Sequence, residues 1–250
     1  MTTFAEVLAA QLRRDPGRPL LTFYDHATDE RVELSVTTYA NWVAKASGLL
    51  SDVADLERGM TLRIDLPPHW LSPVFLGAAW TIGLRVTTSD EPDAVVCGPD
   101  GLDAWAPRAA TVPVLACSLR PLGVRFAGPL PAGVLDVGVE IWSQPDGFAA
   151  WDPPTDDDLA TDDLAQRELF SPTSNDPAGN DLAGNDRTAA GGRSLTDGGR
   201  LLSVADPASP PGMATFTEPL GRGGSLVLVR NPDPDRLDGV YDAERATARA

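Results

Sequence analysis

The chain has 250 residues, 42% of them hydrophobic, so it can bury the core of one large domain or two small ones. Its formal net charge is −16 at pH 7, which argues against partners that need clustered Lys and Arg, namely nucleic acids and anionic membranes. The N-terminus has no signal-peptide pattern, and the most apolar stretch is too short to span a bilayer. We therefore expect a cytoplasmic protein.

Hydrophobic periodicity predicts regular elements in the first 150 residues, which we expect to form an α/β subdomain. In chain order they are a helix over 3–14, a hairpin of strands 20–24 and 31–34, a helix over 35–51, a strand over 60–66, a buried helix over 70–82, and short strands at 85–88, 94–97 and 112–117 with a helical piece at 102–109. Residues 134–142 fit a helix and a strand equally well. Because strands and helices alternate over 60–117, we predict a layered fold with a substantially parallel sheet.

The composition changes at Trp151, after which the chain is rich in Asp, Gly, Pro and Asn. We expect residues 151–199 to form an acidic mobile loop, because such a segment cannot bury enough apolar surface to order itself. The carboxylates at 156–158 and 162–163 lack the alternating spacing of a calcium loop, so no metal ligand is predicted. Residues 200–250 then predict a strand, a helix over 211–220, a strand and a last helix over 235–249, which complete the α/β domain.

Few side chains in this sequence have the pattern of a reactive group. Lys45 is the single lysine, and it lies off the apolar face of its helix, so we expect a solvated surface charge. Cys97 and Cys117 end short apolar runs and are expected to be buried thiols. His26 is expected to be solvated in a turn, whereas His69 precedes a helix and could meet an anion there, although a structural role beside the cap is favoured. We therefore predict no catalytic residue.

The six tryptophans are a further feature of the composition. They could form a platform on which nucleic-acid bases stack, but few basic residues lie near them in the sequence. We expect them to line the core or a pocket. They are Trp42, Trp70, Trp80, Trp105, Trp142 and Trp151.

Residues 170–179, Phe-Ser-Pro-Thr-Ser-Asn-Asp-Pro-Ala-Gly, are similar to a phosphate-binding loop that has lost several binding residues. In a working loop, glycines let backbone N–H groups approach phosphate and a lysine adds positive charge. Pro172, Asn175 and Ala178 stand where such a loop would have Gly, Gly and Lys. The predicted cofactor-binding positions are those that keep the pattern: Ser171, Thr173, Ser174 and Gly179.

Several blocks of sequence, taken in order, resemble the N-terminal domain of the adenylate-forming enzymes. This superfamily contains the AMP-dependent acyl-CoA synthetases, peptide-synthetase adenylation domains and luciferases. The blocks are residues 18–25, 33–50, 62–68, 75–78, 199–203 and 219–229. The resemblance implies a layered mixed sheet with flanking helices. It also places the 170–179 loop where the family has its Ser/Thr/Gly-rich phosphate loop, with Pro177 as a further match.

The departures from the family pattern concern its chemistry. The family's lysine position is Ala178, and Pro172 removes an N–H donor at a glycine position. Loss of one such charge-assisted contact costs about 2–4 kcal/mol of transition-state stabilisation. The family's later nucleotide-binding half and its domain with a catalytic lysine would follow residue 250, so we expect both to be missing.

These observations favour a degenerate relative of the AMP-forming ligases, a binding or regulatory module that adenylates nothing by itself and needs no cofactor. One alternative is an AMP-forming acid ligase of the acyl-CoA synthetase type, using ATP and Mg²⁺, which a separate lysine-bearing protein completes. Another is an unrelated α/β binding protein whose composition produces the resemblance.

Overall fold

The computed structural model describes residues 2–170 and 195–250. Within them the strands are β1 (Pro19–Asp25), β2 (Glu30–Ser35), β3 (Thr61–Asp65), β4 (Arg85–Val86), β5 (Ala94–Cys97), β6 (Val114–Ala116), β7 (Val134–Asp136), β8 (Arg200–Ser203), β9 (Ser225–Arg230) and β10 (Ala248–Arg249). The α-helices are α1 (Phe4–Arg14), α2 (Val36–Gly48), α3 (Leu71–Ile82), α4 (Leu102–Trp105), α5 (Val137–Glu140), α6 (Ala214–Gly221) and α7 (Pro234–Ala243).

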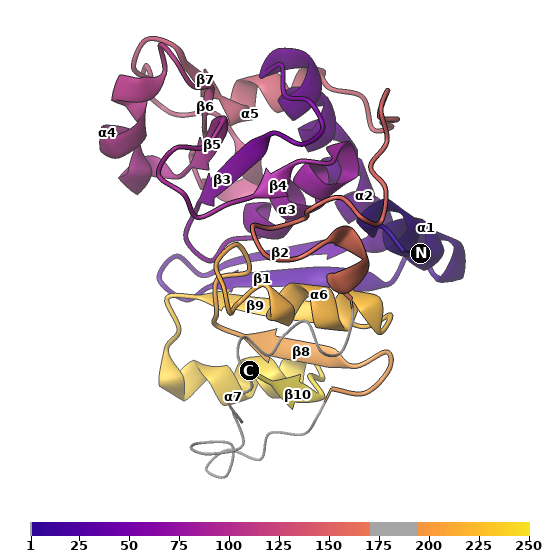
Figure 1. Ribbon diagram of the computed structural model, residues 1–250. Helices are drawn as coiled ribbons and strands as arrows, with labels where there is room; N and C mark the ends of the chain where they lie inside the picture. Colours follow the sequence, from indigo (N-terminus) through magenta and orange to yellow (C-terminus); the bar gives the residue numbers. More distant parts are fainter. Residues whose placement is uncertain (1, 171–194) are drawn as a thin grey trace.

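The described strands form two five-stranded sheets, which lie one above the other in Figure 1. The hairpin sheet has the order β10-β8-β9-β1-β2, with β1 and β2 antiparallel and the other neighbours parallel. The parallel sheet has the order β4-β3-β5-β6-β7, and all of its neighbours are parallel. This arrangement confirms the predicted layered mixed α/β fold.

Helix α3 lies between the two sheets (Figure 1), and this position explains its composition. All of its 12 residues except Thr81 are buried. The main hydrophobic core joins α3 to Phe23 and Leu228 of the hairpin sheet and to Leu62 and Val96 of the parallel sheet. A helix with apolar neighbours on every side has no polar face, as the sequence predicted.

Side chains cap the starts of the first two helices. Thr3 and Glu6 form a reciprocal capping box at α1, in which each side chain accepts the other residue's backbone N–H. The Ser35 hydroxyl accepts the Thr38 N–H at the start of α2. A π-helical turn, Leu49–Val53, then extends α2. None of the helices in the described ranges has the length and hydropathy that a membrane span requires.

The structure changes one predicted element and decides another. The last helix ends at Ala243 instead of continuing to 249, because Arg245 has a left-handed φ of 52° and the chain turns back. Ala248 then pairs with Leu201 of β8, which adds β10 to the sheet. Residues 134–142 contain both candidate structures in succession, β7 followed by α5.

The described part of the acidic segment, residues 151–170, packs on the helices. Gln166 is fully buried, donates to the Trp80 carbonyl at 2.7 Å and accepts the Phe4 N–H at 3.0 Å. The Trp80 indole N–H in turn donates to the Ala160 carbonyl at 2.9 Å. Asp158, expected to be solvated, forms a 2.8 Å ion pair with Arg58. The composition of the segment does not predict this order, because the partners come from elsewhere in the chain.

Candidate functional site

The predicted phosphate loop lies outside the described residues, but its two flanks are described. Phe170 packs on α6, where a Cβ added to Gly221 would lie 3.3 Å from the Phe170 ring. Leu195 is buried with Leu201 of β8 and Ala248 of β10. Both flanks therefore adjoin the hairpin sheet. The predicted site residues within the loop stay predictions: Ser171, Thr173, Ser174 and Gly179.

Ligands of open α/β folds bind beyond the carboxyl ends of the parallel strands. In the hairpin sheet, β1 ends at Asp25, whose Oδ1 accepts the side-chain amide of Asn231 at 2.9 Å. The following residue, His26, is buried, and its Nδ1 accepts the Asp233 N–H at 2.9 Å. The prediction of a solvated His26 is therefore wrong, because the loop after β9 covers the turn.

His69 lies in the core close to the same edge and is only 1% exposed. Its Nδ1 accepts the Leu71 N–H at 3.2 Å, and its ring meets Phe23 edge-on at 4.8 Å. Burial, assisted by the positive charge of Arg230 and opposed by Asp25, lowers the pKa of His69 to about 3. His69 is thus neutral at physiological pH, and the favoured structural role beside the helix start agrees with these contacts.

Two carboxylates that end or follow strands of different sheets, Asp65 and Asp206, lie near enough to interact. Asp65 ends β3, and its Oδ2 accepts the Trp105 indole N–H at 2.6 Å. Asp206 follows β8 and accepts the Ala208 N–H at 3.0 Å and the Ser209 hydroxyl at 2.9 Å. Burial raises the pKa of Asp206, and repulsion from Asp65 adds to this increase. Burial and the neighbouring carboxylate thus both disfavour the charged form of Asp206.

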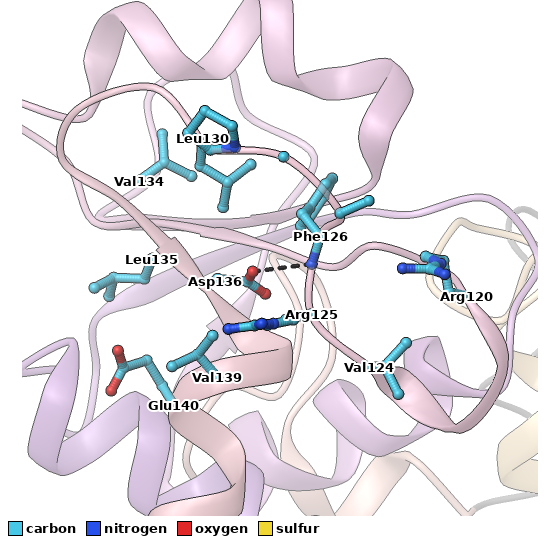
Figure 2. Close-up of a pocket in the computed structure, with 13 residues that line it drawn as sticks. Arg120, Val124, Arg125, Phe126, Leu130, Val134, Leu135, Asp136, Val139 and Glu140 are labelled. Atoms are coloured by element: carbon cyan, nitrogen blue, oxygen red, sulfur yellow. Dashed lines mark hydrogen bonds between the residues drawn. The ribbon is translucent and has the colours of Figure 1, made fainter.

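A cavity of about 830 Å³ lies against β7, the loop that precedes it and helix α5 (Figure 2). In Figure 2 the Arg125 side chain runs between Asp136 and Val139, while Arg120 lies on the opposite side of the loop. Asp136 accepts the N–H groups of Phe126 and Gly138, at 3.0 and 2.9 Å. Since Glu140 also lines the cavity, two acidic groups accompany the two arginines. The apolar lining consists mainly of Val124, Phe126, Leu130, Val134, Leu135 and Val139.

Lys45 is not the solvated surface charge that its helix position predicts. Its side chain is 17% exposed, and its ammonium pairs with Asp146 at 3.0 Å and donates to the Gln144 carbonyl. The segment that follows α5 provides both partners, which the helical pattern alone could not indicate. The single lysine is thus already engaged in structural contacts.

The two cysteines confirm the prediction of buried thiols. Burial, with a contribution from Asp65, raises the pKa of Cys97 to about 12, and burial raises that of Cys117 as well. Neither thiol forms the thiolate that nucleophilic chemistry needs. Within residues 2–170 and 195–250, His, Cys, Asp and Glu side chains form no cluster of three that could hold a metal ion.

Comparison with known proteins identifies the family. No model of a known protein family matches the chain. A "TIGR03089 family protein" of Mycobacterium tuberculosis (strain ATCC 25618 / H37Rv) is 33% identical over 252 residues, which cover 98% of this chain and 97% of that protein. The chain belongs to the TIGR03089 family.

Solved structures similar to this TIGR03089 family member include acyl-CoA synthetases and ligases. An acyl-CoA synthetase of Brucella canis matches 97% of the chain with a TM-score of 0.73 and 16% identity. The N-terminal domain of FACL13 from Mycobacterium tuberculosis matches 98% of the chain with a TM-score of 0.69 and 13% identity. A benzoate CoA ligase of Burkholderia xenovorans LB400 matches 100% of the chain with a TM-score of 0.68 and 12% identity. The family member spans 46%, 62% and 50% of these chains, respectively.

These likenesses establish the fold, which is that of the N-terminal domain of AMP-forming ligases, as the sequence blocks predicted. The predicted order of hairpin, helix, strand and buried helix over residues 20–82 is present in this TIGR03089 family member. This order of elements does not support the alternative in which composition alone produces the resemblance. Sequence reasoning did not find Asp206 or the arginines of the cavity in Figure 2, because no motif marks them.

Proposed function

We propose that this member of the TIGR03089 family is a ligase-like binding or regulatory module that does not form acyl-adenylates on its own. The observation that carries the proposal is the negative charge of four carboxylates that end or follow strands, among which lie Arg230 at the end of β9 and the two arginines of the cavity in Figure 2. This charge comes from carboxylates of both sheets: Asp25, Asp65, Asp136 and Asp206.

Adenylation needs the opposite electrostatics. Attack of a carboxylate on the α-phosphate of ATP builds negative charge, which enzymes stabilise with lysine, arginine, magnesium and backbone N–H groups. Carboxylates beside a triphosphate raise the energy of both the bound nucleotide and the transition state. Burial raises the pKa of Asp206, and repulsion from Asp65 adds to the increase. These described residues fit a nucleotide triphosphate poorly, so we derive no reaction step through it.

The chain's own lysine does not offset this charge. Lys45 is bound to Asp146 and to the Gln144 carbonyl, so its use in catalysis would require breaking both contacts. The loop sequence supports the same proposal, since Ala178 replaces the family's lysine and Pro172 replaces a glycine.

Isothermal titration calorimetry with ATP and Mg²⁺ tests the proposal directly. We expect no saturable heat for the wild-type chain. The triple variant Pro172→Gly, Asn175→Gly, Ala178→Lys restores the family's loop residues and should gain measurable nucleotide binding if the loop is a vestige of that site. Micromolar ATP binding by the wild-type protein contradicts the proposal.

One observation favours a second candidate, an AMP-forming ligase completed by a separate protein. The chain spans only about half the length of the solved acyl-CoA synthetases, while 97–100% of it matches their fold. A lysine-bearing second chain could then supply the positive charge. A pyrophosphate-release assay with ATP, Mg²⁺ and a panel of carboxylic acids, run with and without candidate partner proteins, distinguishes the two. Release that depends on a partner supports the second candidate.

A further inference from the structure

A second cavity, of about 530 Å³, lies between the edge strand β2 and helix α2, and nothing above assigns a role to it. Cavities that bind small molecules have volumes of roughly 300–1,000 Å³, mostly apolar or aromatic walls and a few polar groups. This cavity has the same character. Its apolar lining consists of Val32, Leu34, Trp42, Trp70, Leu122 and Trp142.

Three of the predicted pocket tryptophans form the aromatic wall. The Trp42 ring meets Trp70 at 4.9 Å with an interplanar angle of 71° and meets Trp142 at 5.5 Å with an angle of 68°. Trp70 is buried, but Trp142 is 54% exposed. The wall therefore leaves indole surface uncovered where a flat ring can stack.

The loop around Leu119–Gly123, which borders the cavity, has a strained backbone. Leu122 has a left-handed φ of 63° and is 70% exposed, and Leu119 in the same loop has a φ of 54°. A Cβ added to Gly123 would lie 3.5 Å from the rings of both Trp42 and Trp70, so the loop backbone sits directly on the aromatic wall. Left-handed leucines are strained, and such strain concentrates at ligand sites. An exposed leucine held in this way is available for contact with a ligand.

The charged groups of the lining determine which polar atom the ligand carries. Lys45 pairs with Asp146 at 3.0 Å, and Arg31 pairs with Glu33 at 2.6 Å, so each acid already has a cation. The Lys45 ammonium has three N–H donors, of which two bind described residues, and the Trp70 indole N–H has no acceptor within the described ranges. Lys45 and Arg31 would repel a cationic ligand, whereas the oxygen of a neutral or anionic ligand could accept a hydrogen bond from one of these N–H groups.

We propose that this cavity binds a planar aromatic molecule that carries a carbonyl or carboxylate oxygen. The ring stacks against Trp142 beneath Leu122, and the oxygen accepts the remaining N–H of Lys45. The inference does not depend on nucleotide binding, because none of the carboxylates that argue against ATP lines this cavity.

The test uses ligand-observed NMR titrations of the full chain with four probes. Benzamide and benzoate have the ring and the oxygen, cyclohexanecarboxamide has the oxygen without the flat ring, and phenyltrimethylammonium has the ring with a positive charge. We expect saturable binding of benzamide and benzoate, binding of cyclohexanecarboxamide that is weaker by about tenfold or more, and none of the cation.

Two substitutions locate the binding site. Trp142→Ala should weaken benzamide binding by about tenfold or more, since truncation of a central tryptophan commonly costs this much. Trp151→Ala is the matched control, because Trp151 is fully exposed and does not line the cavity, and it should keep wild-type affinity. Lys45→Met should weaken the binding of benzamide and benzoate, and thermal melts verify that each variant is folded.

Three results would overturn the proposal. They are the absence of saturable binding by benzamide and benzoate, equal affinities of the Trp142 and Trp151 variants for benzamide, and cation binding as tight as that of benzamide. Each leaves the ATP titration unaffected, so failure here is distinguishable from failure of the proposed function.

Discussion

His69 shows how one buried side chain can make stability depend on pH. Its ring is enclosed by apolar neighbours, and its Nδ1 accepts a backbone N–H, so the neutral form fits the site. Burial and the nearby Arg230 lower its pKa to about 3. In the unfolded chain a histidine titrates near pH 6.5. Between about pH 6.5 and pH 3, His69 is therefore protonated in the unfolded state but not in the folded state.

The free energy of unfolding should therefore fall as the pH drops below about 6.5, and this loss should continue toward pH 3. Between pH 7.5 and 5.5 we expect His69 to account for about 1.4 kcal/mol. Urea denaturation at both pH values measures this change. In His69→Asn, which keeps an acceptor for the Leu71 N–H and does not titrate, the pH dependence should shrink by this amount. An unchanged dependence in the variant contradicts the assignment.

At the scale of elements, Gly77 of α3 lies in close contact with side chains of two other helices. A Cβ at this position would lie 2.5 Å from the Tyr39 hydroxyl, 2.7 Å from the Phe4 ring and 2.9 Å from a Val43 methyl group. Glycine thus allows α1 and α2 to pack directly against α3. Helix propensity alone would favour alanine by about 1 kcal/mol, so packing decides the residue here.

Gly77→Ala should lower the free energy of unfolding by about 1–2 kcal/mol net, because the overpacking cost exceeds the gain in propensity. Gly239→Ala is its matched control in α7, since Gly239 has no atoms within 4 Å of the added Cβ and no left-handed φ. This change should stabilise the protein by about 0.5–1 kcal/mol. Urea denaturation of the two variants measures both effects, and a stabilising Gly77→Ala would show that the three helices can move apart at little cost.

At the scale of the whole molecule, Glu244 connects the beginning of the chain to its end. Its carboxylate lies after α7, is 8% exposed and accepts hydrogen bonds from Tyr24, Arg31 and Arg200. These partners belong to β1, β2 and β8, so one side chain joins the hairpin to the C-terminal part of the same sheet. The hydrogen bonds outweigh the effect of burial and lower the pKa of Glu244.

Glu244→Ala should cost about 3 kcal/mol of stability, because it leaves the partly buried Arg200 and the phenol of Tyr24 without their acceptor. The control is Glu33→Ala, which removes the exposed partner of Arg31 and should cost less than about 1 kcal/mol. Equal effects of the two substitutions, measured by chemical denaturation, would mean that the Glu244 cluster is as weak as a surface ion pair.

The local sequence predicts the features of this fold whose causes lie within a few residues. The caps at Thr3 and Ser35 are determined by side chains that reach the next turn. The wholly apolar run of α3 predicts its burial between layers, and the apolar strands of 60–117 predict a parallel sheet. The order of these elements predicted a layered α/β fold, and the resemblance of sequence blocks to the adenylate-forming enzymes predicted which one.

Long-range contacts decide the environment of the polar side chains and the position of the cavities. Lys45 donates to a carbonyl 99 residues away, and His26 accepts an N–H 207 residues away. Gln166 binds one residue that lies 86 positions from it in the sequence and another that lies 162 positions from it. The tryptophan cavity likewise combines α2, the residue before α3 and two later loops. Local periodicity cannot place such groups, because burial of a polar atom depends on partners that only the folded chain brings within hydrogen-bonding distance.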